Sequence, residues 1–177
     1  FLIFEKNEHD PEKMKTTLKA GLWAGIVLYV ASWFQQYGIQ LTDAAGKAGF
    51  ITGLYIIFVP VSYFLFFRKK TGIQVWLGAI CAAVGLFLLC YKPGEGFSVG
   101  LGELLLFICS LLWTVHVILI DHFGKKLRSL HYSWGQFAVC AALGIIFMFI
   151  FEGDRLSVDA LVDAKWVLLY LGVLSSG

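Results

Sequence analysis

The chain of 177 residues is rich in hydrophobic residues (59%) and poor in charged ones (15%), whereas soluble proteins average about 45–50% and 25%. Its mean hydropathy is +0.78, and its net charge of +2 is too small for a basic nucleic-acid-binding surface. We therefore expect an all-α, polytopic membrane helix bundle that lies in a lipid bilayer and has no nucleic-acid partner.

The second long apolar run, residues 48–67, is the clearest predicted membrane span. Its 20 residues carry no formal charge, which is enough to cross about 30 Å of hydrocarbon as a helix. Twelve of them are Phe, Ile, Leu or Val, so insertion is favoured by roughly 4–7 kcal/mol. Pro60 lies inside this run and deprives the carbonyl of Ile56 of its usual partner. We predict a kinked helix here, with Pro60 as its hinge.

The remaining apolar runs divide the chain into further spans. Residues 1–4 are expected to end an earlier span, and Glu5–Lys19 to form a polar loop broken by Pro11. The predicted complete spans are Leu18–Gln40, Ala48–Phe67 (its helix starting near Thr42), Ile73–Tyr91, Leu101–Ile120 and Ser133–Phe151. Trp166–Gly177 would begin a sixth span, so the chain is expected to be a piece of a longer protein. The connections are short, so sequential neighbours should be antiparallel.

The distribution of basic residues predicts the orientation of the spans. Lys and Arg number 10 on one side, in residues 1–19, 68–72 and 121–132, and 4 on the other, in residues 41–47, 92–100 and 152–165. Cytoplasmic loops of membrane proteins carry an excess of positive charge. Loops 5–19, 68–72 and 121–132 are therefore expected in the cytoplasm, in a plasma (bacterial inner) membrane.

Small residues recur at helical spacing in three consecutive spans. Lipid tails are as apolar as leucine, so membrane helices gain by close approach of their backbones. The predicted packing glycines are Gly21, Gly25, Gly49, Gly53, Gly78 and Gly85, which pair with one another or with Ala82 and Cys81. This repetition predicts a tight bundle.

Polar side chains form stripes along the predicted spans, as expected of helices that line a water-filled path. Tyr29, Trp33, Gln36 and Gln40 share one face of the first span, flanked by Gln35 and Tyr37. The other candidate cavity residues are Thr52 and Tyr55 in the second span (with Ser62 and Tyr63 on the same face), Ser110, Trp113 and Thr114 in the fourth, and Gln136 in the fifth. Each stripe has an alternative role as a helix–helix contact.

Three ionisable residues within or beside the spans each allow two interpretations. Glu103 is either a solvated carboxylate at a helix end or a proton carrier. His116 either makes an interfacial hydrogen bond about one turn from the end of its span or titrates in a transport cycle. Lys47 either pairs with Asp43 at i+4 spacing or binds an anion. If transport is coupled to protons, Glu103 and His116 are the candidates within this chain.

No motif for catalysis, a metal or a cofactor is present. Cys81, Cys90, Cys109 and Cys140 all lie in apolar runs and are expected to be free, buried thiols. We find no Ser/His/Asp grouping, no H-E-x-x-H, no P-loop and no G-x-G-x-x-G. We therefore expect neither a metal nor a cofactor, and no enzymatic activity.

Several segments resemble the EamA-type repeat of the drug/metabolite transporter superfamily. GIQLTDAAGKAGFITGLYIIFVPV, a basic turn and VWLGAICAAVGLFLL resemble the end of one repeat, and GELLLFICSLLWTVHVILIDHF resembles the first helix of a second. The resemblance implies a ten-helix carrier built from two inverted five-helix repeats, with residues 18–91 in the first, 92–100 as an extracytoplasmic linker and 101–177 in the second. The turn Arg68–Gly72 lacks the acidic residue that many members carry there.

The resemblance also implies a function. Members are mostly exporters of metabolites, amino acids or drugs with a central cavity, which maps here onto Trp33, Gln36, Tyr37, Gln40, Thr52, Tyr55, Trp113 and Gln136. The hypothesis is efflux of a small molecule by alternating access, with the protein either a monomer or a homodimer. The alternatives are a membrane scaffold or receptor subunit, whose stripes would pack dry against one another, and a membrane-embedded enzyme, which would need reactive groups at one depth.

Overall fold

The computed structural model describes residues 11–42, 45–68, 72–90, 100–124, 127, 129–151, 165, 166 and 170. The helices within these ranges are α1 (Pro11–Gln40), α2 (Ala45–Gly53), α3 (Tyr55–Leu65), α4 (Ile73–Cys90), α5 (Leu101–Gly124) and α6 (Ser129–Phe151). The chain divides into two units, Phe1–Ala141 and Ala142–Gly177, and each is described by itself.

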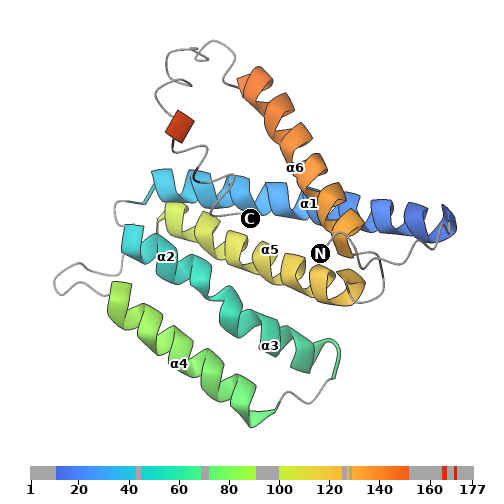
Figure 1. Ribbon diagram of the computed structural model, residues 1–177. Helices are drawn as coiled ribbons and strands as arrows, with labels where there is room; N and C mark the ends of the chain where they lie inside the picture. The colour runs from blue at the N-terminus through green and yellow to red at the C-terminus, as the bar shows by residue number, and fades with distance from the viewer. Residues whose placement is uncertain are drawn as a thin grey trace. The chain divides into compact units, whose positions relative to one another are not determined.

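In the first unit, α5 is the central helix. It packs most extensively against α1, and its other side contacts α2 and α3. Helix α4 contacts α2 and α3 in turn, so the order across the unit is α1, α5, the α2–α3 pair and α4 (Figure 1). Residues 1–10, the linker at residues 91–99 and, except for Trp166 and Tyr170, the predicted sixth span lie outside the described residues.

Two predicted loops are shorter than expected because the neighbouring helices extend into them. Residues 11–19 belong to α1, so the prediction that Pro11 breaks a loop here is wrong. Proline is favoured in the first turn of a helix, where its missing N–H has no intrahelical partner to lose, and Glu12 suits the positive end of the helix dipole. The predicted loop 121–132 is reduced from both sides, since α5 continues to Gly124 and α6 begins at Ser129.

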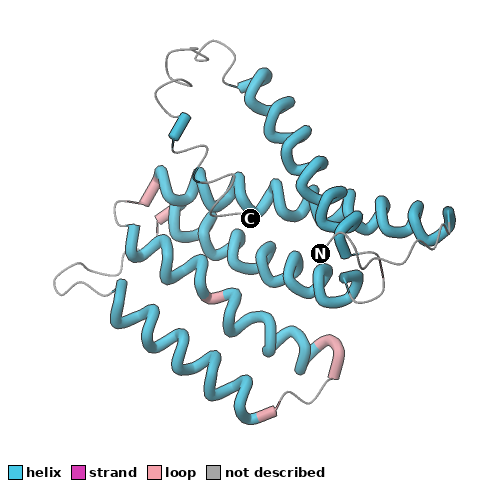
Figure 2. The backbone as a smooth tube through the Cα atoms, viewed as in Figure 1, coloured by secondary structure: helices cyan, strands magenta, loops and turns pink. Residues whose placement is uncertain are grey.

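The second predicted span is interrupted at Leu54, between α2 and α3 (Figure 2). The N–H of Leu54 bonds to the carbonyl of Ile51 at 3.2 Å, and its own carbonyl accepts from both Ile57 and Phe58. Pro60 lies buried within α3. The irregularity lies at Leu54, about a turn and a half before Pro60, and Leu54 itself keeps helical dihedral angles (φ −58°, ψ −20°). The hinge at Pro60 stays a prediction.

Glycines bring α1 and α5 into backbone contact near the end of α1 and the start of α5. A Cβ added at Gly38 would lie 2.8 Å from Cγ of Leu106 and 3.1 Å from the carbonyl oxygen of Gly102. One added at Gly102 would lie 3.0 Å from the carbonyl carbon of Leu41. Neither position leaves room for a side chain, so the two backbones lie close together at this crossing.

The predicted packing glycines fall into two groups. Gly21 and Gly25 lie against α6, where a Cβ at Gly25 would be 2.6 Å from the carbonyl oxygen of Gln136. Gly53 stands in close contact with Leu86 of α4. In contrast, Gly49, Gly78 and Gly85 have no atom of another residue near the position of an added Cβ. Within the part of the chain that the structure describes, these last three do not mediate packing.

The surface of the described residues is largely apolar. Large hydrophobic side chains are exposed on every described helix except α2, and Trp23 of α1 (65%) and Leu88 of α4 (68%) are examples. Four stretches of the described helices are long and apolar enough to cross a membrane: Met14–Gln40, Ala45–Leu65, Leu101–Gly124 and Ser129–Phe151. Ile73–Leu88 is a shorter apolar helix. The protein is thus a bundle of membrane-spanning helices whose outer faces suit lipid.

Cysteines within the described part of the chain are free thiols. Cys109 is buried and Cys140 half-buried, but Cys81 is exposed on α4, against the expectation of burial. The side chain of Cys90 lies outside the described residues.

In the second unit, the ring of Phe147 stacks on that of Phe151, with 5.6 Å between the ring centroids.

The glycine crossing of α1 and α5 yields a first prediction. Gly102→Ala should lower the free energy of unfolding by about 1–3 kcal/mol, because the added methyl group forces the two backbones apart. Gly49→Ala is the matched control: its Cβ meets open space, and alanine favours helix by up to about 1 kcal/mol. Thermal unfolding of the purified protein in detergent measures both. Equal midpoints for the two variants would contradict the close crossing.

Candidate functional site: a polar and aromatic cluster between two inter-helix ties

Three rings from α3 and α5 form an aromatic cluster, which we define as Tyr55, Trp113 and His116. The Tyr55 and Trp113 ring centroids are 6.4 Å apart, and those of Trp113 and His116 are 5.6 Å apart in an edge-to-face arrangement. Thr52 precedes Tyr55 by about one helical turn, on the other side of the break at Leu54. The structure thus brings together Tyr55 and Trp113 of the predicted cavity and adds His116 to them.

Several polar atoms at the cluster are buried. Within the described residues, Thr52 Oγ1 and His116 Nδ1 have no hydrogen-bond partner, and the Trp113 indole N–H has only the weakly accepting thiol of Cys109, one turn earlier in α5. His116 is only 4% exposed, and its ring hydrogen-bonds to the backbone of Ala24 in α1. The helix α5 continues to Gly124, so His116 lies about two turns from the end of the helix, where the sequence suggested about one turn.

An unsatisfied buried hydroxyl or N–H costs about 1–3 kcal/mol. The three polar groups differ in kind: the indole only donates, the hydroxyl both donates and accepts, and a neutral imidazole nitrogen accepts. Together with the ring faces, they form a mixed polar and aromatic region of α2, α3 and α5.

Ser110 and Thr114, which were also predicted to line the cavity, are satisfied within their own helix. The Ser110 hydroxyl donates to the carbonyl of Phe107 at 2.7 Å, and the Thr114 hydroxyl donates to the carbonyl of Ser110 at 2.8 Å. Both residues are buried. Their hydroxyls therefore need no solute as a partner.

The predicted stripe of α1 lies on the side of the helix away from α5. Buried residues of α1 recur at helical spacing, as in Ala24, Leu28 and Ala31. The stripe falls on the opposite face: Trp33, Gln36, Tyr37 and Gln40 are exposed and Tyr29 is half-buried. The rings of Trp33 and Tyr37 stack on each other, with 5.5 Å between the ring centroids. This face does not join the aromatic cluster within the described part of the chain.

Gln136 lies apart from the cluster, where α6 meets α1. It is 6% exposed, its Oε1 has no partner among the described residues, and its backbone stands against Gly25. A cavity of about 460 Å³ lies between these two helices, lined by Leu18, Leu130, His131, Trp134, Gly135 and Ala138. None of the predicted cavity residues lines this apolar space.

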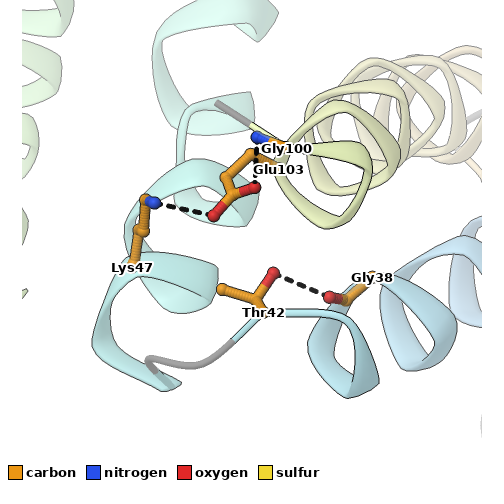
Figure 3. A network of polar contacts seen from close by, with 5 residues as sticks. All are labelled: Gly38, Thr42, Lys47, Gly100 and Glu103. Carbon is orange, nitrogen blue, oxygen red and sulfur yellow. Dashed lines mark hydrogen bonds and ion pairs between the residues drawn. The ribbon is translucent and has the colours of Figure 1, made fainter. Parts of the chain in front are cut away.

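An ion pair ties the start of α2 to the start of α5. Lys47 Nζ lies 2.7 Å from Glu103 Oε1, and the two side chains are only 17% and 11% exposed (Figure 3). The second carboxylate oxygen of Glu103 accepts from the N–H of Gly100 at 2.8 Å, which caps α5. Glu103 is therefore a paired, part-buried carboxylate and not a solvated one. Asp43, the predicted partner of Lys47, lies outside the described residues.

A hydrogen bond joins the end of α3 to the end of α5. The Tyr63 hydroxyl of α3 donates to Asp121 Oδ2 of α5 at 2.6 Å. Lys47 and Glu103 stand near the starts of their helices, and Tyr63 and Asp121 near the ends. The α2–α3 pair and α5 thus run in the same direction, with the aromatic cluster between the two ties.

These features define a polytopic membrane protein with a cluster of aromatic and polar side chains between two of its spans. The family model of the EamA-like transporter family matches residues 1–91, and the chain belongs to this family. It is similar to an uncharacterized transporter of Archaeoglobus fulgidus (27% identity over 122 residues, 68% of this chain and 38% of the relative).

A second relative is the uncharacterized transporter YoaV of Bacillus subtilis strain 168, with 27% identity over 143 residues, 80% of this chain and 48% of the relative. The chain spans less than half the length of either relative. No solved structure matches the chain.

The tie between α3 and α5 yields a second prediction. Tyr63→Phe should destabilise the protein by about 1–3 kcal/mol, because a half-buried carboxylate loses a short, charge-assisted hydrogen bond. Tyr37→Phe is the control, since it removes the same hydroxyl from an exposed ring. Unfolding in detergent, followed by circular dichroism, measures the difference. If Tyr63→Phe lowers the stability no more than Tyr37→Phe does, the bond does not support the fold.

Proposed function

We propose that the protein exports a small metabolite, amino acid or drug by alternating access through a central cavity. The observation that carries this proposal is that two buried polar atoms in and next to the aromatic cluster, Thr52 Oγ1 and His116 Nδ1, have no partner among the described residues. In a bilayer no water reaches such groups from the lipid side, so a polar site at mid-depth belongs to a solute path. The absence of charged groups among these residues favours a solute with an apolar or aromatic body.

The proposed architecture is a ten-helix carrier of two inverted five-helix repeats. The family match ends at residue 91, where the first repeat is proposed to end. The same direction of α2–α3 and α5 supports the proposal, because alternating spans place the last but one helix of the first repeat parallel to the first helix of the second. In this arrangement α1, α2–α3 and α4 are the last three helices of the first repeat.

We also propose an orientation and a location. The excess of Lys and Arg supports a cytoplasmic side for residues 5–19, 68–72 and 121–132. The Lys47–Glu103 ion pair then lies near the extracytoplasmic face and the Tyr63–Asp121 bond near the cytoplasmic face. The membrane is the plasma membrane, in keeping with the archaeal and bacterial sources of the two relatives.

The stripe of α1 is proposed to complete the path. Amide and aromatic side chains at Trp33, Gln36, Tyr37 and Gln40 are costly to expose to lipid at the depth of a span. Their face is left uncovered within the described residues, and the chain spans less than half the length of its relatives. Helices of the complete carrier are proposed to cover it and to share the cavity.

A third prediction separates the unpartnered hydroxyl from a satisfied one. Thr52→Val should weaken binding and transport of a solute by about tenfold, equivalent to about 1.4 kcal/mol, because the solute loses a hydrogen bond. Thr114→Val is the matched control, since its hydroxyl bonds to its own helix. A thermal-shift screen of metabolites, amino acids and drugs on the full-length protein identifies the solute, and uptake into proteoliposomes measures transport.

Transport that is equally affected in the two threonine variants would remove the cluster from the solute path. A screen and a counterflow assay in which no organic solute binds or moves would contradict the proposed function itself.

A fourth prediction concerns the stripe. Gln36→Leu should reduce transport in inverted vesicles severalfold while the amount of inserted protein stays unchanged, because the amide is proposed to face the path and not to support the fold. Immunoblotting of the membrane fraction provides the control. Unchanged transport would place the stripe outside the path.

A further inference from the structure

The contacts around Lys47 and Glu103 point to a closed gate at one end of the solute path. We infer that this ion pair and the apolar layer beneath it close the access of the aromatic cluster to the membrane face at which α2 and α5 begin. The inference rests on the proposed function, because a gate has meaning only for a path.

The ion pair is built to hold one geometry. One oxygen of the Glu103 carboxylate is fixed by the N–H of Gly100 at 2.8 Å, which leaves the other aimed at Lys47 Nζ at 2.7 Å (Figure 3). Both side chains are partly buried, at 17% and 11% exposure, so water screens the pair less than it screens a fully exposed pair. The pair therefore joins α2 directly to α5 at the membrane face where both helices begin.

A dry layer lies directly beneath the pair. Ala48, Ile51 and Leu106 form a cluster of buried hydrophobic residues, and Phe50 packs against it. Ala48 follows Lys47 in α2, and Leu106 follows Glu103 by about one turn of α5. The layer is 3%, 6% and 0% exposed at its three residues, so it leaves no wet passage between the two helices.

The aromatic cluster comes next along both helices. Thr52 follows Ile51 directly, and Tyr55 and Trp113 lie deeper in α3 and α5. The order from the membrane face inward is therefore ion pair, apolar layer and polar cluster. A solute can reach the cluster from this face only when α2 moves away from α5.

The break at Leu54 makes such a movement local. Helix α2 is a separate segment of nine residues, Ala45–Gly53, that carries Lys47 and the two apolar residues of the layer. Helix α3 is tied to α5 by the Tyr63–Asp121 bond at 2.6 Å and by the Phe58–Phe107 ring contact at 5.7 Å. Opening therefore displaces α2 about Leu54 while α3 stays in place.

Accessibility of a buried cysteine tests the gate. The probe is a full-length protein whose only cysteine replaces Ala48, reconstituted in nanodiscs and labelled with a membrane-impermeant maleimide. With the ion pair intact the thiol should be protected. Glu103→Gln should raise the labelling rate on the order of tenfold, because it weakens the pair but leaves an oxygen to accept from Gly100. Lys47→Glu should raise it further.

The charge swap and a remote control make the test specific. The double variant Lys47→Glu/Glu103→Lys should restore protection, whereas Lys15→Glu, the same charge change on an exposed residue of α1, should leave labelling slow. The gate is overturned if Glu103→Gln leaves the thiol protected, if the swap labels as fast as Lys47→Glu, or if Lys15→Glu labels equally fast.

The labelling assay needs no solute, so it fails or succeeds separately from the transport assay. Labelling that depends on the ion pair, with no transport of any solute, would contradict the proposed function and leave the closure itself standing. Transport with labelling that ignores the ion pair would leave the function standing and overturn the gate.

Discussion

In a bilayer, helices gain nothing by hiding apolar side chains from water, so their association depends on close backbone contact and on polar ties. The crossing of α1 and α5 at Gly38 and Gly102 meets the first requirement, since the two backbones touch where neither residue has a side chain. The rest of the first unit is assembled around α5, which contacts α1 on one side and α2 and α3 on the other. Without this crossing, the aromatic cluster would lose the Ala24 backbone to which His116 is bonded.

Polar residues of the bundle differ in their partners. Two contacts join helices near their ends, the Lys47–Glu103 pair and the Tyr63–Asp121 bond. Other hydroxyls bond to their own helix, as those of Thr42 and Thr114 do, and the buried hydroxyls of Thr52 and Tyr132 have no partner among the described residues. An unsatisfied buried group lowers stability, whereas a charge-assisted contact between helices raises it. The Thr52 hydroxyl is the group that the proposed solute would bind.

The fold class and the order of the spans were predictable, because apolar length and loop charge are properties of the sequence alone. The break at Leu54 was not, because the strongest local signal is Pro60 and proline is accommodated within α3. The i+4 spacing favours Asp43 as the partner of Lys47. However, alternating spans make the helices of Lys47 and Glu103 parallel, so both residues come at the same end of the bundle. The same alternation brings Tyr63 and Asp121 to one face. A search of the sequence for polar residues at matching depths in parallel spans could have found both pairs.

Nor could the sequence separate Thr52 from Ser110 and Thr114, because all three are hydroxyl residues on polar faces of predicted spans. The distinction depends on the regularity of the helix around each residue. Ser110 and Thr114 lie in regular helix, where the carbonyl one turn earlier accepts their hydroxyls. Thr52 stands beside the interruption at Leu54, and its buried oxygen has no such partner among the described residues. The same irregularity thus separates α2 from α3 and leaves a hydroxyl available to a solute. A movement of α2 about Leu54 would carry Thr52 with it, so opening the gate and loosening the site are one event.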